Sequence, residues 1–206
     1  MSESIDHLSR RSFLRAGGAA AVASVVGGAA LDEAQARPPA GRDGITPYPA
    51  TGAKITLKVN GRERELTVTP ATTLLSALRE PLGLTGCKEV CDRGACGACT
   101  VLVNGKSVNS CLMLAIDAVG SEITTVEGLA TDGTLDPVQQ AFADCDACQC
   151  GYCIPGFVVR SKAMLAETPN PDLEQIKSGL SGNICRCAAY ARIIQAVQTA
   201  AKGGAL

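Results

Sequence analysis

Alternating apolar and polar positions in the first half of the chain predict short strands joined by tight turns. Residues 55–59 carry apolar side chains at every second position, and the Asn60-Gly61 pair that follows is a strong hairpin signal. Residues 62–69 read as the returning strand. A second hairpin is predicted over residues 100–108, with its turn at Asn104-Gly105.

The same half of the chain predicts one short helix and a further strand. Residues 72–80 follow a helical apolar pattern, with Thr72 or Thr73 in position to cap the helix and Pro81 to end it. Residues 122–129 can supply another strand. Together these elements predict a small mixed sheet accompanied by a helix.

After about residue 135 the apolar positions change to a helical period. Asp136 and Pro137 are residue types of an N-cap and a first helical position, and they open a helix that continues through residue 145. Three more helical segments are predicted over residues 155–167, 171–180 and 185–202. Four helices after a sheet predict an α+β chain that ends in a small helical bundle.

Composition narrows the chemistry that this fold could carry. The net charge of −1 gives no bulk attraction to nucleic acid or to an anionic membrane. The chain has eleven cysteines but a single histidine, His7, close to the amino terminus. Rieske clusters, Cys/His zinc sites, Ser-His-Asp triads and Cys-His nucleophile pairs all need an imidazole, so none can be built from the rest of the chain.

The amino-terminal region predicts an export signal. The adjacent Arg10 and Arg11, an Ala-rich apolar stretch and a final Ala-Gln-Ala resemble a twin-arginine (Tat) signal over residues 1–36, which would engage the Tat translocon and direct the protein to the periplasm. The alternative is a basic tail followed by an Ala-rich helix. The stretch is too short and Gly-rich for a membrane span, so no stable anchor is expected. Residues 37–52, rich in Pro and Gly, read as a linker or extended arm.

Four cysteines in the first half have the spacing of plant-type [2Fe–2S] ferredoxins, C-x4-C-x2-C followed by a distant fourth: Cys91, Cys96, Cys99 and Cys111. Gly94 and Gly97 permit the tight turns that bring backbone N–H groups towards cluster sulfurs. A four-cysteine zinc site and disulfides are the alternatives. Delivery of the fourth cysteine by the second hairpin favours iron–sulfur.

The second half crowds four cysteines into residues 145–153, where two C-x2-C pairs overlap: Cys145 with Cys148, and Cys150 with Cys153. Cys185 and Cys187 follow further along the chain. Together with the second pair they fall where predicted helices begin, and there the helix dipole and free N–H groups stabilise thiolate charge. Spacing alone leaves open which pair carries the chemistry.

The segments around these cysteines resemble the iron–sulfur subunits of the molybdenum hydroxylases, the xanthine oxidase family. CDRGACGACTVLVNG (91–105) resembles the family's ferredoxin-like motif, and QCGYCIPG (149–156) with GNICRC (182–187) resembles its second-cluster motif. The resemblance covers essentially residues 53–200, in the family's order. With the Tat-like signal, it is nearest to the small subunit of periplasmic aldehyde oxidoreductases.

The resemblance implies a fold, ligand sets and a cofactor contact. The implied fold is α+β, with an N-terminal β-grasp [2Fe–2S] ferredoxin-like domain over residues 53–130 and a C-terminal four-helix [2Fe–2S]-binding bundle over residues 131–206. The implied ligands are Cys91, Cys96, Cys99 and Cys111 for the first cluster and Cys150, Cys153, Cys185 and Cys187 for the second. Gln149 is implied to contact the pterin of a molybdenum cofactor held by a large subunit, the alternative being a surface glutamine.

Some residues near the motifs have no such assignment. Cys87, Cys145 and Cys148 read as free thiols, with a Cys145–Cys148 disulfide as the alternative. Arg186 could raise the potential of the second cluster, pair across an interface or simply be solvated. The chain departs from the family pattern beside the ligands, which bears on cluster potential and partner fit: Arg93, Tyr152, Ile154, Ala188 and Ala189.

The resemblance also implies a function shared among subunits. A molybdenum subunit would oxidise an aldehyde to a carboxylic acid, and electrons would pass through the helical-domain cluster and then the ferredoxin-like cluster to FAD on a flavin subunit, in a heterotrimer. The chain has no Rossmann G-x-G-x-x-G motif, so both redox ends are expected on partners. The alternatives are the iron–sulfur subunit of a xanthine or N-heterocycle dehydrogenase, a free-standing ferredoxin, and a non-catalytic protein held by zinc or disulfides.

Overall fold

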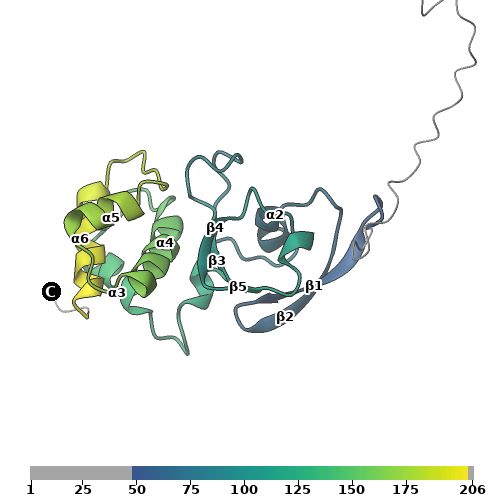
Figure 1. Ribbon diagram of the computed structural model, residues 1–206, viewed down its shortest axis with the longest axis horizontal. Coiled ribbons are helices and arrows are strands. Elements are labelled where there is room, and N and C mark those ends of the chain that lie inside the picture. Colours follow the sequence, from purple (N-terminus) through teal and green to yellow (C-terminus); the bar gives the residue numbers. More distant parts are fainter. Residues whose placement is uncertain (1–47, 204–206) are drawn as a thin grey trace, which may run out of the picture. The chain divides into compact units, whose positions relative to one another are not determined.

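The computed structural model describes residues 48–203 (Figure 1). The predicted signal, residues 1–36, and all but the last five residues of the predicted arm, residues 37–52, lie outside these described residues. In the described part, no helix is both long enough and apolar enough to cross a membrane.

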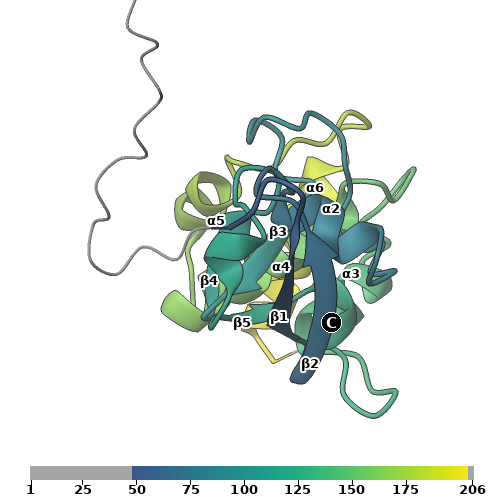
Figure 2. The ribbon, with the colours of Figure 1, turned by 90° about the vertical axis from the view of Figure 1, so that its right-hand side faces the viewer.

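Five strands form one mixed sheet in the order β2-β1-β5-β3-β4. Their bounds are β1 Ala53–Val59, β2 Arg62–Val68, β3 Thr100–Val103, β4 Lys106–Asn109 and β5 Glu122–Thr124. The antiparallel pairs β1/β2 and β3/β4 are the two predicted hairpins, and Figure 2 shows β1 beside β2. Both turns have positive φ at Asn and Gly, 51° and 73° in the first and 51° and 77° in the second, as a two-residue turn requires.

Strand β5 joins the two hairpins into one sheet, because it pairs in parallel with β1 and antiparallel with β3. The backbone N–H of Asn60 donates to the carbonyl of Ile123 at 2.8 Å. The Asn60 side chain accepts from the Thr125 N–H at 2.9 Å and donates to the Thr125 hydroxyl at 3.0 Å. Beyond Thr124 the chain turns into a short 3-10 helix, η2 (Val126–Gly128), so the predicted strand over residues 122–129 is correct only in its first three residues.

Helix α2 (Leu74–Arg79) supplies the sheet with an apolar cover. The Thr73 hydroxyl accepts from the Ser76 N–H at 3.2 Å, which makes Thr73 the cap. Leu74, Leu75 and Leu78 are buried and join the core that alternate residues of β1 and β3 also enter. A second 3-10 helix, η1 (Ile116–Ala118), packs at the border of this core.

Four helices follow the sheet, as the apolar period predicts: α3 (Pro137–Asp144), α4 (Ile154–Glu167), α5 (Leu173–Gly179) and α6 (Tyr190–Ala201). Asp136 and Asp172 cap α3 and α5 through capping boxes. Phe157, Ile176, Ile193 and Val197 are fully buried and form a second core among these helices. The expected α+β fold, a ferredoxin-like sheet followed by a helical bundle, is therefore confirmed.

The predicted helix over residues 185–202 is wrong in its first turn, because α6 begins only at Tyr190. Residues two positions apart do not share a helix face, so a helix could not turn both Cys185 and Cys187 inward. Ala188 instead adopts a φ of 59°, which breaks any helix at that point. The Tyr190 hydroxyl accepts from the Cys185 N–H at 2.9 Å and fixes the loop to the helix that follows it.

Helix α4 is the element that joins the sheet to the other helices. Its Val159 and Ala163 pack against Leu102 of β3 in a small buried cluster. The Arg160 side chain donates from Nε to the Gly179 carbonyl at 2.7 Å and from Nη1 to the Ser107 hydroxyl at 2.6 Å. The middle of α4 is thereby held against the sheet.

Candidate metal centres

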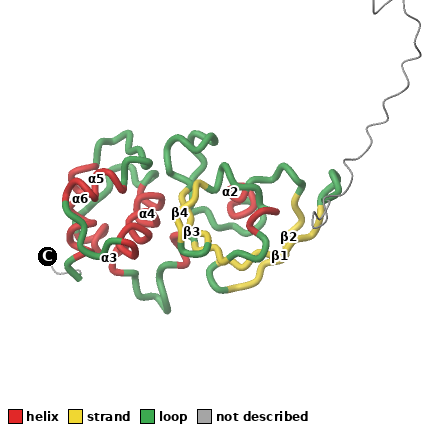
Figure 3. Tube along the Cα trace, in the orientation of Figure 1, coloured by secondary structure: helices red, strands yellow, loops and turns green. Residues whose placement is uncertain are grey.

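The eight cysteines of the two predicted sets lie in loops or at strand and helix ends, as Figure 3 shows for the chain between the regular elements. Cys91 and Cys96 lie in the long loop before β3, and Cys99 directly precedes that strand. Cys111 follows β4, so the second hairpin delivers it. Loops of this kind leave backbone N–H groups free to point at sulfur.

The first set is brought together as two pairs. The thiols of Cys91 and Cys96 are close enough to influence each other's protonation, and so are those of Cys111 and Cys99. The Gly94 N–H donates to the Cys111 sulfur at 3.2 Å, as expected for a loop that wraps a cluster.

The second set shows the same arrangement. The thiols of Cys150 and Cys187 are close enough to influence each other's protonation, and so are those of Cys153 and Cys185. The Ala189 N–H donates to the Cys185 sulfur at 3.4 Å. The structure therefore brings Cys150 and Cys153, from the crowded segment, to the CRC loop that lies more than thirty residues further along the chain.

Pairs of thiols suit a binuclear cluster better than a single ion. Within residues 48–203, no group of three or more His, Cys, Asp or Glu side chains is placed to hold one metal ion. A structural zinc ion takes four ligands at one centre, whereas each iron of a [2Fe–2S] cluster takes two from the protein. Four pairs in two sets thus match two binuclear clusters.

The protonation of these thiols is compatible with a bound metal centre. Burial and then the neighbouring Cys185 thiol raise the pKa of Cys153 to about 12. Burial and then the Cys99 thiol raise the pKa of Cys111 to about 11. In contrast, a hydrogen bond from the Arg93 N–H lowers the pKa of Cys91 to about 7. Buried thiols of this kind lose their protons when a bound metal supplies positive charge, so the donor set fits an iron–sulfur cluster.

The two ligand loops touch each other, which the sequence did not predict. The Ile184 N–H donates to the Cys96 carbonyl at 2.9 Å, and the Asn183 amide donates to the Gly97 carbonyl at 2.9 Å. From the other side, Gly156 of α4 lies so close to Gly97 that a Cβ on Gly156 would stand 2.3 Å from the Gly97 oxygen. The only sequence signals were a glycine inside a helical pattern and the Gly-Asn pair before the CRC loop.

Gln149 lies at the surface beside the second set. Its side chain is exposed and lines a shallow cleft of about 390 Å³ together with Asp146, Cys148, Ala189 and Arg192. Arg192 donates to the Asp146 carbonyl at 3.2 Å and pairs with its carboxylate. An exposed glutamine next to Cys150 is in a position to contact a partner molecule.

The unassigned cysteines differ in their environments. Cys87 is buried in the core of the sheet, Cys145 is half-buried and Cys148 is exposed. Burial raises the pKa of Cys87 to about 11, with Glu127 adding to the effect. All eleven cysteines are free in the structure, and none of the disulfide alternatives is formed in its described part. Arg186 is exposed.

Two family models match adjacent parts of the chain. A 2Fe-2S iron-sulfur cluster binding domain matches residues 57–130, and a [2Fe-2S] binding domain matches residues 125–198. The first match contains the first set of cysteines, and the second contains the other set.

Individual proteins are similar over much of the chain. The aldehyde oxidoreductase iron-sulfur-binding subunit PaoA of Escherichia coli O157:H7 is 44% identical over 209 aligned positions, which cover 94% of this chain and 88% of that subunit. The nicotinate dehydrogenase small FeS subunit of Eubacterium barkeri is 47% identical over 71% of this chain and 93% of its own. A chain of quinoline 2-oxidoreductase from Pseudomonas putida 86 superposes with a TM-score of 0.71 at 40% identity, over 74% of this chain and 96% of that one.

Proposed function

Because the chain belongs to the iron–sulfur subunits of the molybdenum hydroxylases, the xanthine oxidase family, we propose that it serves a molybdenum-dependent aldehyde oxidoreductase. It is an electron-transfer subunit with two [2Fe–2S] clusters, and the oxidation chemistry takes place on a partner. The similarity to the E. coli aldehyde oxidoreductase subunit over 94% of the chain supports aldehyde as the substrate class.

The pairing of the thiols supports the proposed assignment of cluster ligands. Cys91 with Cys96 and Cys99 with Cys111 would each hold one iron of the first cluster, and Cys150 with Cys187 and Cys153 with Cys185 would do so in the second. When bound, such clusters supply one-electron carriers. The chain contributes the thiolates, the N–H groups that approach sulfur and the burial that excludes water, which together set the potentials.

The proposed partner subunits are inferred from the proteins to which this chain is similar. A large molybdenum subunit is the electron donor, since the relatives are small subunits of multi-subunit oxidoreductases. The exposed Gln149 would contact the pterin of its cofactor. The acceptor would be an FAD-binding subunit, giving a heterotrimer, with residues 53–130 carrying the first cluster and residues 131–206 the second.

A second substrate class has its own support. The nicotinate dehydrogenase subunit is 47% identical to this chain, so the partner could instead oxidise an N-heterocycle. Purifying the native complex and assaying aldehydes and N-heterocycles side by side, with molybdenum, iron and flavin analysis, separates these cases. Aldehyde turnover with about four iron atoms per chain supports the proposal. Stoichiometric zinc in place of iron, or turnover of N-heterocycles alone, would contradict it.

We also propose that the complex works in the periplasm after Tat export. The arrangement of Arg10 and Arg11 before an apolar stretch that ends in Ala-Gln-Ala supports this. The Tat route would suit a cysteine-rich chain that receives its clusters before it meets an oxidising compartment. Replacement of both arginines with lysine is expected to retain the protein in the cytoplasm. Normal periplasmic levels of that variant would refute the export route.

A further inference from the structure

One of the two carbonyl groups at which the ligand loops are joined belongs to Gly97. The Gly97 oxygen, in the loop of the first cysteine set, accepts from the Thr100 hydroxyl at 2.6 Å and from the Thr100 N–H at 3.2 Å. It also accepts from the Asn183 amide at 2.9 Å. Thr100 belongs to the same loop and strand, whereas Asn183 comes from the segment that leads into Cys185. Of the donors to the Gly97 carbonyl, Asn183 is therefore the one that comes from the other ligand loop.

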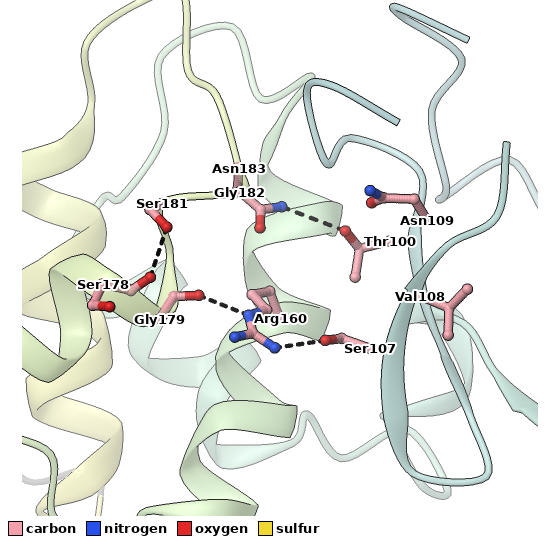
Figure 4. A pocket seen from close by; sticks show the side chains of 10 residues that line it. All are labelled: Thr100, Ser107, Val108, Asn109, Arg160, Ser178, Gly179, Ser181, Gly182 and Asn183. Atoms are coloured by element: carbon pink, nitrogen blue, oxygen red, sulfur yellow. Dashed lines mark hydrogen bonds between the residues drawn. The ribbon is translucent and has the colours of Figure 1, made fainter. Parts of the chain in front are cut away.

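The position of Asn183 is specific in its chemistry. The residue is only 6% exposed, and a carbonyl oxygen can only accept, so the amide nitrogen has to face Gly97. The same nitrogen lies 3.5 Å from the Thr100 hydroxyl, as Figure 4 shows beside a cleft of about 200 Å³. The Gly97 carbonyl is the nearer of its two acceptors, so the buried amide loses its shorter hydrogen bond if that carbonyl moves away.

The next residue extends the contact along the backbone. The Ile184 N–H bonds to the carbonyl of Cys96, while the Ile184 side chain is 52% exposed. A backbone hydrogen bond, rather than apolar packing of its side chain, therefore holds Ile184 against the first loop. Two consecutive residues directly before Cys185 bond to two consecutive residues of the first loop, and one of these is a proposed ligand.

We propose that Asn183 is a positioning residue, which fastens the CRC loop to the first ligand loop and thereby fixes the electronic contact between the two clusters. The inference rests on the proposed function, because it needs both clusters in place. Asn183 is not one of the proposed ligands, and it acts by keeping the Cys96 carbonyl and the Ile184 amide in register.

The chain offers two matched controls. Asn109 donates its amide to the Gly94 carbonyl at 3.1 Å, so it supports the first ligand loop from within the sheet without crossing to the other loop. Arg160 crosses between β4 and α5 but contacts neither ligand loop. Figure 4 shows Arg160 bridging Ser107 and Gly179 on the side of the cleft away from Asn183.

The test uses the purified complex with wild type, Asn183→Ala, Asn109→Ala and Arg160→Met. Magnetic coupling between the reduced clusters is read as splitting in the low-temperature electron paramagnetic resonance spectrum. Hydrogen exchange at the Ile184 amide is followed by mass spectrometry. We expect Asn183→Ala to reduce the splitting and to speed exchange roughly fivefold, the factor for one lost hydrogen bond of ordinary strength. Arg160→Met is expected to behave as wild type in both measurements. Asn109→Ala, which removes a bond within the first loop and its sheet, is expected to leave exchange at the Ile184 amide unchanged.

Several results would overturn the inference. One is unchanged coupling and exchange in Asn183→Ala, and another is an equal loss of coupling in Arg160→Met, which would indicate general packing. The isosteric Asn183→Asp variant, which keeps the shape but removes the donor, is measured in parallel and is expected to loosen the loop in the same way. Loss of the second cluster in both Asn183 variants would show a ligand-holding role instead. A wild-type complex without two clusters would refute the proposed function, and with it any coupling through Asn183.

Discussion

Replacement of Gly156 with alanine tests the contact between α4 and the first ligand loop. The new Cβ would stand 2.3 Å from the Gly97 oxygen and 3.1 Å from the Ala98 Cα, both of which are backbone atoms. The loop and the helix would have to separate, since neither atom can rotate away. Overpacking of this kind costs about 2–3 kcal/mol, and the helix propensity of alanine returns up to about 1 kcal/mol. The net loss of about 1–3 kcal/mol corresponds to a thermal midpoint lower by about 2–12 °C.

Gly182→Ala is the matched control, because no atom lies within 4 Å of the Cβ it would add. Its stability is expected to stay within about 0.5 kcal/mol of wild type. Thermal unfolding of the cluster-loaded complex, followed by circular dichroism at one heating rate, gives the two midpoints. Equal midpoints for the two variants, or a higher one for Gly156→Ala, would refute the close approach of α4 to Gly97.

Three further outcomes are expected. Replacing Cys150 or Cys153 with serine should remove the second cluster, roughly halving the iron content, whereas serine at Cys145 or Cys148 should leave about four iron atoms per chain. The reverse pattern in iron analysis would reassign the ligands. Gln149→Ala should keep the iron but lower turnover or cofactor retention in steady-state assays, and unchanged values would make Gln149 an ordinary surface residue. Burial raises the pKa of Cys87 to about 11, so near neutral pH the thiol stays protonated and should react with iodoacetamide only after denaturation. Rapid labelling of Cys87 in the folded complex would contradict its buried position.

The local elements were predictable because their signals are local. Each Asn-Gly pair imposes its own turn, and Asp136 with Pro137 marks the start of α3. The failure at residues 185–189 has the opposite origin. Its apolar and small residues favour a helix, but the two cysteines must both face the partners that chain folding brings to them, and this long-range demand overrides propensity.

The pairing of thiols could be anticipated only in part. Spacing placed Cys91, Cys96 and Cys99 in one set without dividing it into pairs, and the pairs Cys150 with Cys187 and Cys153 with Cys185 depend on how α4 and α6 pack. The contact of Asn183 with Gly97 joins residues 86 positions apart. No periodic pattern records such a contact, because it satisfies one buried carbonyl rather than a repeating face.

The parallel pairing of β1 with β5 sets an order of events during synthesis. Asn60 and Thr125 are 65 residues apart, and a ribosome needs about 3–13 s to make that length of chain. Throughout this interval β1 lacks one neighbour, while Cys91, Cys96, Cys99 and Cys111 are made on a sheet that is still open. The four thiols are thus made before the three-residue strand that completes the sheet, and until it emerges they depend on the reducing power of the compartment in which the chain is made.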